Sequence, residues 1–298
     1  MKIQHFRFSA MASPCQLHLL GDSTQCRRAA AAVEQEVRRI EQKYSRYRDD
    51  SVLSELNQRA GQICNIDAET AYLLNYARAC WQQSDGLFDI SSGVLRRQWD
   101  FRNARLPDPQ QLQALLARVG FDRCQLQQHN GQHQLLMPTE MEIDFGGIGK
   151  EYAADRAAAL CRQHGIHSGV VDLGGDLLVL GPKPDGSPWL LGVRHPRDPD
   201  KAFAQLPVYE GGMATSGDYE RYFDHQGRRY CHLLNPSSGW PVDYWASVTV
   251  LAPSCLLAGS FSTIAMLKQQ QALDWLQQQG LHFLAIRPDG SHISQRNH

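Results

Sequence analysis

The stretch DFGGIGKEYAADRAAALCRQHGIHSGVVDLGGDLLVLG, residues 144–181, carries the strongest indications of how the chain folds. A glycine-rich turn leads at Lys150 into an alanine-rich run that stops at Gly165, a residue type common just after the end of a helix. The apolar, β-branched residues that follow lie on both sides of Gly174-Gly175, which predicts two short strands or one strand bent by a bulge. The stretch therefore predicts a turn, a helix and then extended structure.

Helices and strands are mixed along the rest of the chain without regular alternation. Apolar residues at steps of three and four predict the helices, and short β-branched runs predict the strands. Because no repeat, low-complexity linker or break in composition divides the sequence, we expect one α+β unit over residues 1–298. The predicted helices are 27–44, 68–83, 108–119, 255–267 and 272–278, and the predicted strands are 190–194, 206–209, 229–234, 247–251 and 282–286.

Composition excludes several classes of protein. The 298 residues carry 30 Lys and Arg against 31 Asp and Glu, so no broad basic face is expected to attract nucleic acid or anionic lipid. No stretch approaches the roughly 20 apolar residues that span a bilayer, so we expect no membrane insertion. Polar residues such as His5 and Arg7 interrupt the N-terminal segment, and the eight cysteines are scattered singly. These features predict a cytoplasmic protein without a signal peptide and with reduced thiols.

Glycines and small polar residues gather in five places where the backbone could approach a ligand and offer N–H groups to phosphate oxygens. Taken alone, each cluster is equally compatible with a tight turn. A Walker A loop is excluded because Asp144 and Glu151 stand where it needs Gly and Ser or Thr, and no G-x-G-x-x-G or H-E-x-x-H motif is found. The clusters are 84–92, 144–150, 172–176, 214–219 and 232–239.

Taken in order, these clusters resemble the ApbE family, the FAD:protein FMN transferases. The similarity runs from about residue 10 to residue 268, and the order of the motifs matches throughout. The matching elements are Ala10-Met11-Ala12-Ser13, then Ser45, Tyr47, Asp50, Ser51 and Asn57, then Gly86-Leu87-Phe88-Asp89-Ile90, Asp144–Asp155, Leu173–Asp176, Thr215–Arg221 and His232–Gly239.

The resemblance implies an ApbE-like, T-fold-related architecture of mostly antiparallel sheets flanked by helices. It also implies a metal-dependent enzyme that takes FMN from FAD and joins it by a phosphoester bond to a Thr or Ser hydroxyl of an acceptor flavoprotein, releasing AMP. Two alternatives remain open: a protein that binds FAD without transferring FMN, and an FAD pyrophosphatase that yields FMN and AMP. A ligand other than a flavin is a further possibility.

Particular residues take roles from this resemblance. His232 is the expected base, because its intrinsic pKa of about 6.5 suits proton transfer at neutral pH. Lys150, at the start of a helix, is expected to face pyrophosphate oxygens, although a solvated lysine is the competing interpretation. Thr263 and the backbone carbonyl of Gly147 are the expected Mg²⁺ ligands. The expected FAD contacts are Met11, Tyr47, Leu87, Phe88, Asp89, Asp144, Lys150, Leu234, Ser216 and Gly217, with core packing as the alternative for Phe88 and Leu234.

The sequence departs from the family pattern at the metal site. Family members carry Asp where this chain has Gly259, and Mg²⁺ usually needs one or two carboxylates. We expect Gly259→Asp to strengthen the dependence on Mg²⁺. Three further departures are Ala12 for Gly, Glu151 for Gly and Asn235 for Asp. The candidates for the missing carboxylate are Asp155, Asp172, Asp176 and Glu151.

Overall fold

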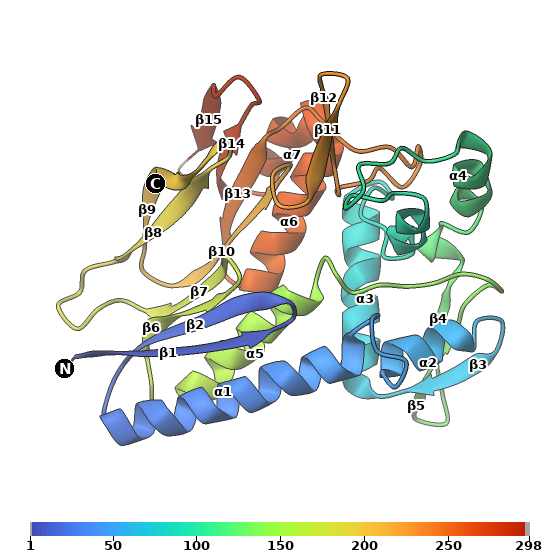
Figure 1. Cartoon of the computed structure of the whole chain (residues 1–298). Coiled ribbons are helices and arrows are strands. Elements are labelled where there is room, and N and C mark those ends of the chain that lie inside the picture. Colours follow the sequence, from blue (N-terminus) through green and yellow to red (C-terminus); the bar gives the residue numbers. More distant parts are fainter. Residues whose placement is uncertain (1, 296–298) are drawn as a thin grey trace.

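A computed structural model describes residues 2–295 of the chain. Its main feature is an eight-stranded sheet in which every neighbouring pair of strands is antiparallel (Figure 1). The strands, in spatial order, are β1 (Ile3–Ala10), β2 (Ser13–Leu20), β6 (Ser168–Leu173), β7 (Asp176–Gly181), β10 (Gly211–Gly217), β13 (Ser247–Ala252), β14 (His282–Ile286) and β15 (His292–Gln295).

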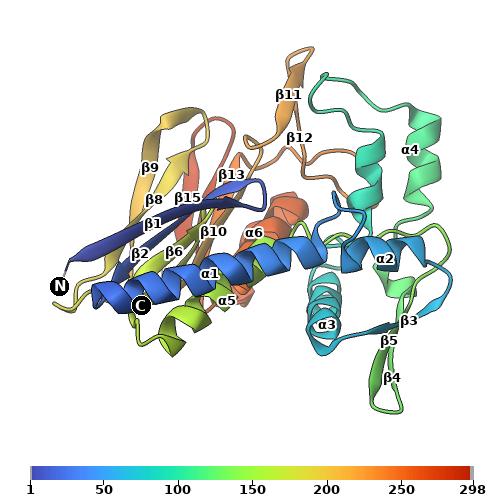
Figure 2. The same ribbon diagram turned by 60° about the horizontal axis from the view of Figure 1, so that its bottom comes forward.

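Both faces of this sheet are covered. On β6, Val171 belongs to the apolar core under the helices, whereas its neighbour Val170 belongs to a second apolar cluster with the hairpin of β8 (Trp189–His195) and β9 (Asp198–Val208). This alternation follows from the two-residue period of a strand. The helices on the first face are α1 (Ser23–Tyr44), α5 (Gly149–Gln163) and α6 (Cys255–Lys268), as Figures 1 and 2 show, and α7 (Ala272–Gln278) packs on α6.

A second group of elements extends beyond the C-terminal end of α1 (Figure 2). It contains a three-stranded sheet in the order β3-β5-β4 and several helices, and a separate hairpin, β11-β12, packs against η1 and α4 of this group. These elements are α2 (Val52–Gln58), β3 (Ile63–Ile66), α3 (Ala68–Gln83), η1 (Ser92–Arg97), α4 (Pro109–Leu116), η2 (Phe121–Arg123), β4 (Gln125–His129), β5 (Gln132–Leu136), β11 (Tyr222–His225) and β12 (Arg228–Cys231). The short helix η3 (Gln269–Gln271) joins α6 to α7.

The predicted α+β class with antiparallel sheets is confirmed. The Gly174-Gly175 pair joins two separate strands, β6 and β7. Helix α1 begins earlier than predicted because the Asp22 side chain accepts hydrogen bonds from the N–H groups of Thr24 and Gln25, which caps the helix at Ser23.

Several predicted segments have different limits, and others were missed. The helix expected over 108–119 covers only Pro109–Leu116, and the strand expected over 229–234 ends at Cys231. The segment 206–209 overlaps the last part of the eleven-residue β9. Sequence patterns did not identify the β1-β2 hairpin or the three-stranded sheet. Within residues 2–295, no helix is both long enough and apolar enough to cross a membrane.

Helix α6 is attached to α5 through one carboxylate. The two oxygens of Asp155, on α5, accept hydrogen bonds from the N–H groups of Cys255 at 2.7 Å and Leu256 at 3.0 Å, which lie in the first turn of α6. The Ser254 hydroxyl caps the same end by accepting from the Leu257 N–H at 3.2 Å. The carboxylate satisfies N–H groups that have no partner within the helix, and it fixes the two helices in register.

We predict that Asp155→Ala lowers the free energy of unfolding by about 2 kcal/mol, because two charge-assisted hydrogen bonds to the start of α6 are lost. Ser254→Ala, which removes one neutral cap at the same helix end, is the matched control and is expected to cost about 1 kcal/mol. Urea denaturation followed by circular dichroism measures both changes. Equal losses for the two variants would contradict the special role of Asp155.

Candidate active site

Lys150 connects two of the glycine clusters. It lies in the first turn of α5, and its Nζ contacts an oxygen of Asp176 at 2.7 Å and donates to the Gly174 carbonyl at 3.2 Å. Burial opposes the charged form, but the Asp176 and Glu151 carboxylates outweigh burial and raise the pKa of Lys150 to about 12. The ammonium group is therefore a fixed positive charge at the N-terminus of a helix, where anions bind favourably.

Three hydroxyl groups meet where β10 faces α6. The Ser216 hydroxyl lies 2.8 Å from that of Ser262 and 2.9 Å from that of Thr263. The structure thus places two predicted site residues, Ser216 and Thr263, in direct contact. The contact of Ser262 with Ser216 was not predicted from the sequence.

Glu151 fills the space beside Gly259. A Cβ atom built on Gly259 would lie 2.5 Å from the Cγ and 3.0 Å from the Oε1 of Glu151, so a side chain at position 259 would require the Glu151 side chain to move. Only 7% of Glu151 is exposed, and its Oε2 is buried without a hydrogen-bond partner among the described residues. Burial and the nearby Asp176 carboxylate raise the pKa of Glu151, whereas Lys150 opposes that change.

These residues fit a hard divalent cation. Gly259 and Thr263 are four residues apart on α6 and share one face of the helix, so the Glu151 carboxylate approaches the face that carries the Thr263 hydroxyl. An unpartnered buried carboxylate oxygen and a hydroxyl are donors of the type that Mg²⁺ prefers. Within residues 2–295, no group of three or more His, Cys, Asp or Glu side chains is arranged to hold a metal ion. The candidate donors here are the unpartnered oxygen of Glu151 and the hydroxyl of Thr263.

Asp144 is held by arginines that sequence reasoning missed. Its carboxylate pairs with Arg46 and Arg96, and it accepts a hydrogen bond from the Gly146 N–H at 2.8 Å. Arg46 also donates to the hydroxyl of Tyr47, and its guanidinium lies 4.6 Å from the centre of that ring. Tyr47 remains 74% exposed, which leaves it accessible to a ligand. Arg46 lies inside the S-x-Y motif, but nothing in the sequence indicated that it faces Asp144.

Other predicted FAD contacts are part of the protein interior. Asp89 accepts hydrogen bonds from the N–H groups of Ser91 at 2.7 Å and Phe121 at 3.0 Å, so it holds its own loop together. Phe88 and Leu234 are 5% and 8% exposed and lie in different apolar clusters, as the core-packing alternative expects. Leu87 and Met11 are half-buried against the main core, and Gly217 pairs with Ser247 in the main sheet.

His232 lies just after β12, in the segment that joins the β11-β12 hairpin to the rest of the chain. Its backbone N–H donates to the Arg221 carbonyl at 3.0 Å, and its Nδ1 is buried without a partner among the described residues. Burial, aided by the positive charge of Arg221, lowers its pKa to about 4. This value lies below the intrinsic one near 6.5, so the ring is neutral at pH 7 and able to accept a proton.

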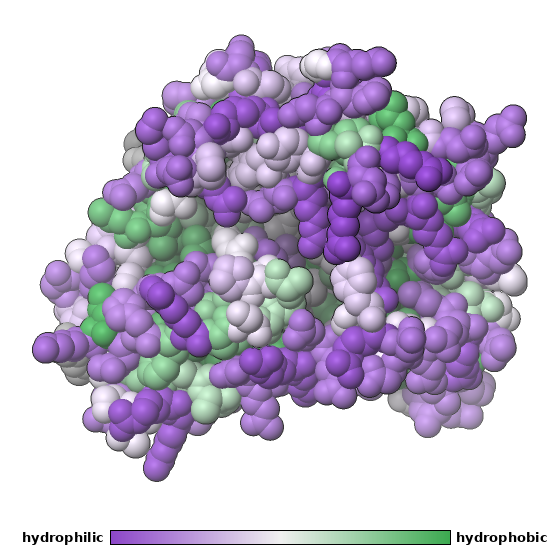
Figure 3. Space-filling view, in the orientation of Figure 1, coloured by the Kyte–Doolittle hydropathy of each residue, from purple (hydrophilic) through white to green (hydrophobic). Residues whose placement is uncertain are grey.

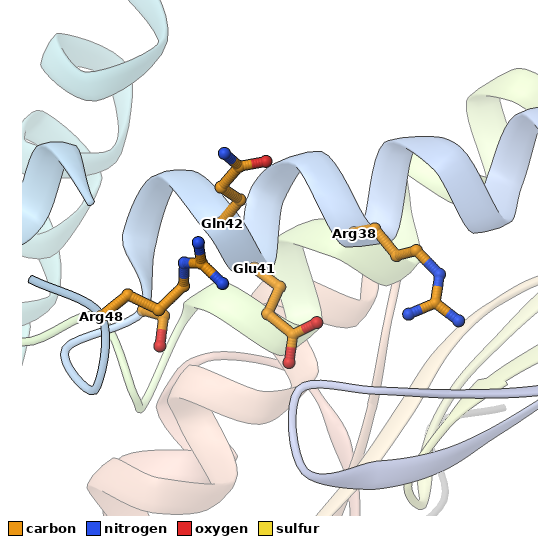
Figure 4. Close-up of a pocket in the computed structure, with 5 residues that line it drawn as sticks. Arg38, Glu41, Gln42 and Arg48 are labelled. Carbon is orange, nitrogen blue, oxygen red and sulfur yellow. The ribbon is translucent and has the colours of Figure 1, made fainter. Parts of the chain in front are cut away.

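Two neighbouring surface cavities lie along α1. One, of about 370 Å³, is lined by Arg38, Glu41, Gln42, Ser45 and Arg48. Figure 4 labels Arg38, Glu41 and Gln42 on the helix and Arg48 in the loop that follows it. The other, of about 540 Å³, shares Arg38 and Glu41 and extends to the β1-β2 turn, where the Met11 N–H donates to Glu41 at 2.6 Å. In Figure 3 the surface is hollowed near the tip of this hairpin. The cavities thus adjoin the first motif of the chain.

Comparison with known proteins places the chain in a class of flavin-transferring proteins. A profile of the ApbE family matches residues 11–285, and the chain belongs to this family. It is 31% identical over 256 residues to the FAD:protein FMN transferase of Salmonella typhimurium, covering 83% of this chain and 73% of the relative. It is 29% identical over 276 residues to that of Haemophilus influenzae, covering 88% and 80%.

Solved structures agree with this assignment. The crystal structure of the ApbE protein from Thermotoga maritima has a TM-score of 0.90 and 28% identity, covering 99% of this chain and 97% of the other. The apo form of the flavinyl transferase ApbE from Pseudomonas stutzeri has a TM-score of 0.87 and 28% identity, covering 99% and 95%. The ApbE-like architecture expected from the sequence is confirmed.

We predict that His232 makes the protein less stable in mild acid. Because the unfolded pKa is about 6.5 and the folded pKa about 4, protons bind the unfolded chain first, and stability falls as the pH drops from about 6.5 to about 4. The loss attributable to His232 is about 3 kcal/mol at most. Chemical denaturation of the wild type and of His232→Gln at several pH values measures it as the difference between the two curves. Parallel curves would contradict the buried, neutral imidazole.

Proposed function

We propose that this protein transfers FMN from FAD to a Thr or Ser hydroxyl of an acceptor flavoprotein and releases AMP. The observation that carries the proposal is the contact between the start of α5 and α6. Lys150 and Glu151 follow the glycine turn 144–149, and Glu151 reaches Gly259, one helical turn from Thr263 and its contact with Ser216. The family membership of the chain and the names of its relatives support the same reaction.

The start of α5 is suited to the pyrophosphate of FAD. The first turn of a helix has N–H groups without partners inside the helix, and Lys150 adds a positive charge there. The turn before it contains Gly146, Gly147 and Gly149, which lack side chains and let a phosphate approach the backbone. We therefore assign the pyrophosphate to this end of α5.

His232 is assigned to the acceptor hydroxyl. A neutral imidazole takes the hydroxyl proton as the oxygen forms a bond to the FMN phosphorus, and the bond from that phosphorus to the bridging oxygen of AMP breaks. The low pKa of His232 keeps the ring in the form that accepts a proton. The exposed ring of Tyr47, held by Arg46, is a candidate surface for the flavin or adenine.

A divalent cation, which we propose to be Mg²⁺, completes this assignment. Thr263 and the backbone carbonyl of Gly147 would hold it, together with a carboxylate. When bound, such a cation would supply positive charge to the pyrophosphate oxygens. The fit of the unpartnered Glu151 oxygen and the hydroxyl cluster to hard cations supports this part of the proposal.

We also propose that the protein works in a reducing compartment, the cytoplasm. All eight cysteines are free thiols, and all are buried. Free thiols are typical of proteins in which disulfides do not form. Cell fractionation with an antibody to the chain tests this assignment.

The transferase test combines two measurements. We incubate the chain with FAD, Mg²⁺ and a small acceptor flavoprotein, and we follow AMP release and the mass of the acceptor together. One AMP for each FMN added to the acceptor is the expected result. Equal amounts of free FMN and AMP, with no change in the acceptor mass, would instead identify a pyrophosphatase. Intact FAD retained on the protein would identify a flavin-binding protein that has no transfer activity.

We predict that His232→Ala lowers the transfer rate about 1,000-fold, because a general base contributes roughly 10²–10⁴-fold to such a step. FAD binding, measured by fluorescence quenching, is expected to change less than about twofold. His225→Ala, in the neighbouring β11-β12 hairpin, is the matched control and should keep the wild-type rate. A normal transfer rate in His232→Ala would remove this residue from the mechanism.

A further inference from the structure

We propose that Glu151 is the carboxylate ligand of the divalent cation. Glu151 supplies from α5 the carboxylate oxygen that an acidic side chain at position 259 would supply from α6. The proposal extends the proposed function, because it names the residue that completes its metal site. It rests on the contact between Glu151 and Gly259 and on the unpartnered Oε2 of Glu151.

The other three candidate acids are already engaged. Asp155 uses both oxygens to hold the first turn of α6. Asp172 accepts a hydrogen bond from the Gly175 N–H at 2.8 Å and stabilises the turn between β6 and β7. Asp176 forms the ion pair with Lys150 at 2.7 Å. Of the four acids, Glu151 alone has a buried oxygen without a partner among the described residues.

The position of Glu151 matches the place where a ligand is required. Its side chain crosses from α5 to α6 and lies against Gly259, one helical turn before Thr263. The Thr263 hydroxyl is oriented by its contact with Ser216 at 2.9 Å. Gly147, whose carbonyl is the third proposed ligand, lies in the turn directly before α5. The three proposed ligands thus come from the start of α5 and from the facing helix α6.

The contact also explains why position 259 is glycine. Because a Cβ there would lie 2.5 Å from the Cγ of Glu151, the two positions cannot both carry side chains in this arrangement. A buried carboxylate without a partner is costly, and a cation held by this oxygen removes that cost. Gly259 therefore leaves the room that the Glu151 side chain occupies, and Glu151 is the one carboxylate at the proposed metal site.

The kind of cation follows from the donors. One carboxylate, one hydroxyl and one backbone carbonyl are all hard oxygen ligands, which suit Mg²⁺ and Mn²⁺ and leave positions for phosphate oxygens. This set contains no thiolate or imidazole, the ligands typical of zinc sites. We therefore use Mn²⁺ as a spectroscopic probe and Mg²⁺ as its competitor.

The first test measures metal binding without the reaction. Mn²⁺ is titrated into the chain in the presence of ADP, which supplies a diphosphate but no flavin, and free Mn²⁺ is followed by electron paramagnetic resonance. We expect Glu151→Gln to weaken Mn²⁺ binding about 100-fold or more, because a lost ligand costs at least as much as a lost outer-shell partner. Glutamine keeps the volume of the side chain, and circular dichroism verifies the fold.

Asp172→Asn is the matched control, because it neutralises another acid near Lys150 that the proposal leaves outside the site. Its affinity for Mn²⁺ is expected to stay within about threefold of the wild type. Wild-type affinity in Glu151→Gln, or a loss confined to Asp172→Asn, would overturn the assignment of Glu151.

A second test exchanges the two side chains. Gly259→Asp alone is expected to lower the melting temperature and to leave Mn²⁺ binding unimproved, because the new Cβ collides with Glu151. The structure thus changes the sequence-based expectation that this substitution by itself strengthens the site. The double variant Glu151→Gly, Gly259→Asp is expected to recover Mn²⁺ affinity to within about tenfold of the wild type. Tighter binding in Gly259→Asp than in the double variant would contradict the mutual exclusion.

The same variants separate this inference from the proposed function. Loss of Mn²⁺ binding in Glu151→Gln supports the ligand assignment even if the wild type transfers no FMN. Conversely, the wild type could transfer FMN while Glu151→Gln binds Mn²⁺ normally. That result would support the transferase function and would reject Glu151 as the ligand.

Discussion

The contact between α5 and α6 is the constraint on which the site depends. Asp155 fixes the first turn of α6 to α5 by two hydrogen bonds, and this register brings Gly259 against Glu151 one turn further along. Both helices pack on the central strands of the main sheet, so their relative position is set by a large core as well as by the carboxylate. Small changes at this contact would move the proposed ligands Glu151 and Thr263 relative to each other.

The site combines charges of opposite sign in a confined space. Lys150, Asp176 and Glu151 belong to one cluster, in which the partly exposed lysine is held charged by the two buried acids. Its charge is therefore largely balanced by the protein before any phosphate arrives. A dianionic pyrophosphate then needs additional positive charge, which the proposed cation supplies. Asp144, at the start of the glycine turn, pairs with both Arg46 and Arg96, so this second group carries a net positive charge.

The sequence predicted those helices and strands that depend on local residue patterns. The helix after the glycine turn, the extended structure around Gly174-Gly175 and the antiparallel class all followed from local patterns or from the family motifs, and the structure confirms them. Whether Gly174-Gly175 joins two strands or bends one was left open by the sequence. Pairings between distant segments were not predictable, such as Arg46 with Asp144. The choice among four acids was equally out of reach, because it depends on which oxygens already have partners. The predicted roles of His232 and of the FAD contacts stay predictions.

The mutual exclusion of side chains at positions 151 and 259 also limits how such a site can change over generations. A chain that carries its carboxylate at one position cannot acquire the other in a single substitution without crowding the interior. The alternative route passes through glycine at both positions, which removes the acid and leaves a cavity between two helices. Either intermediate is impaired, so the two arrangements are separated by a barrier and each is expected to persist within its own lineage.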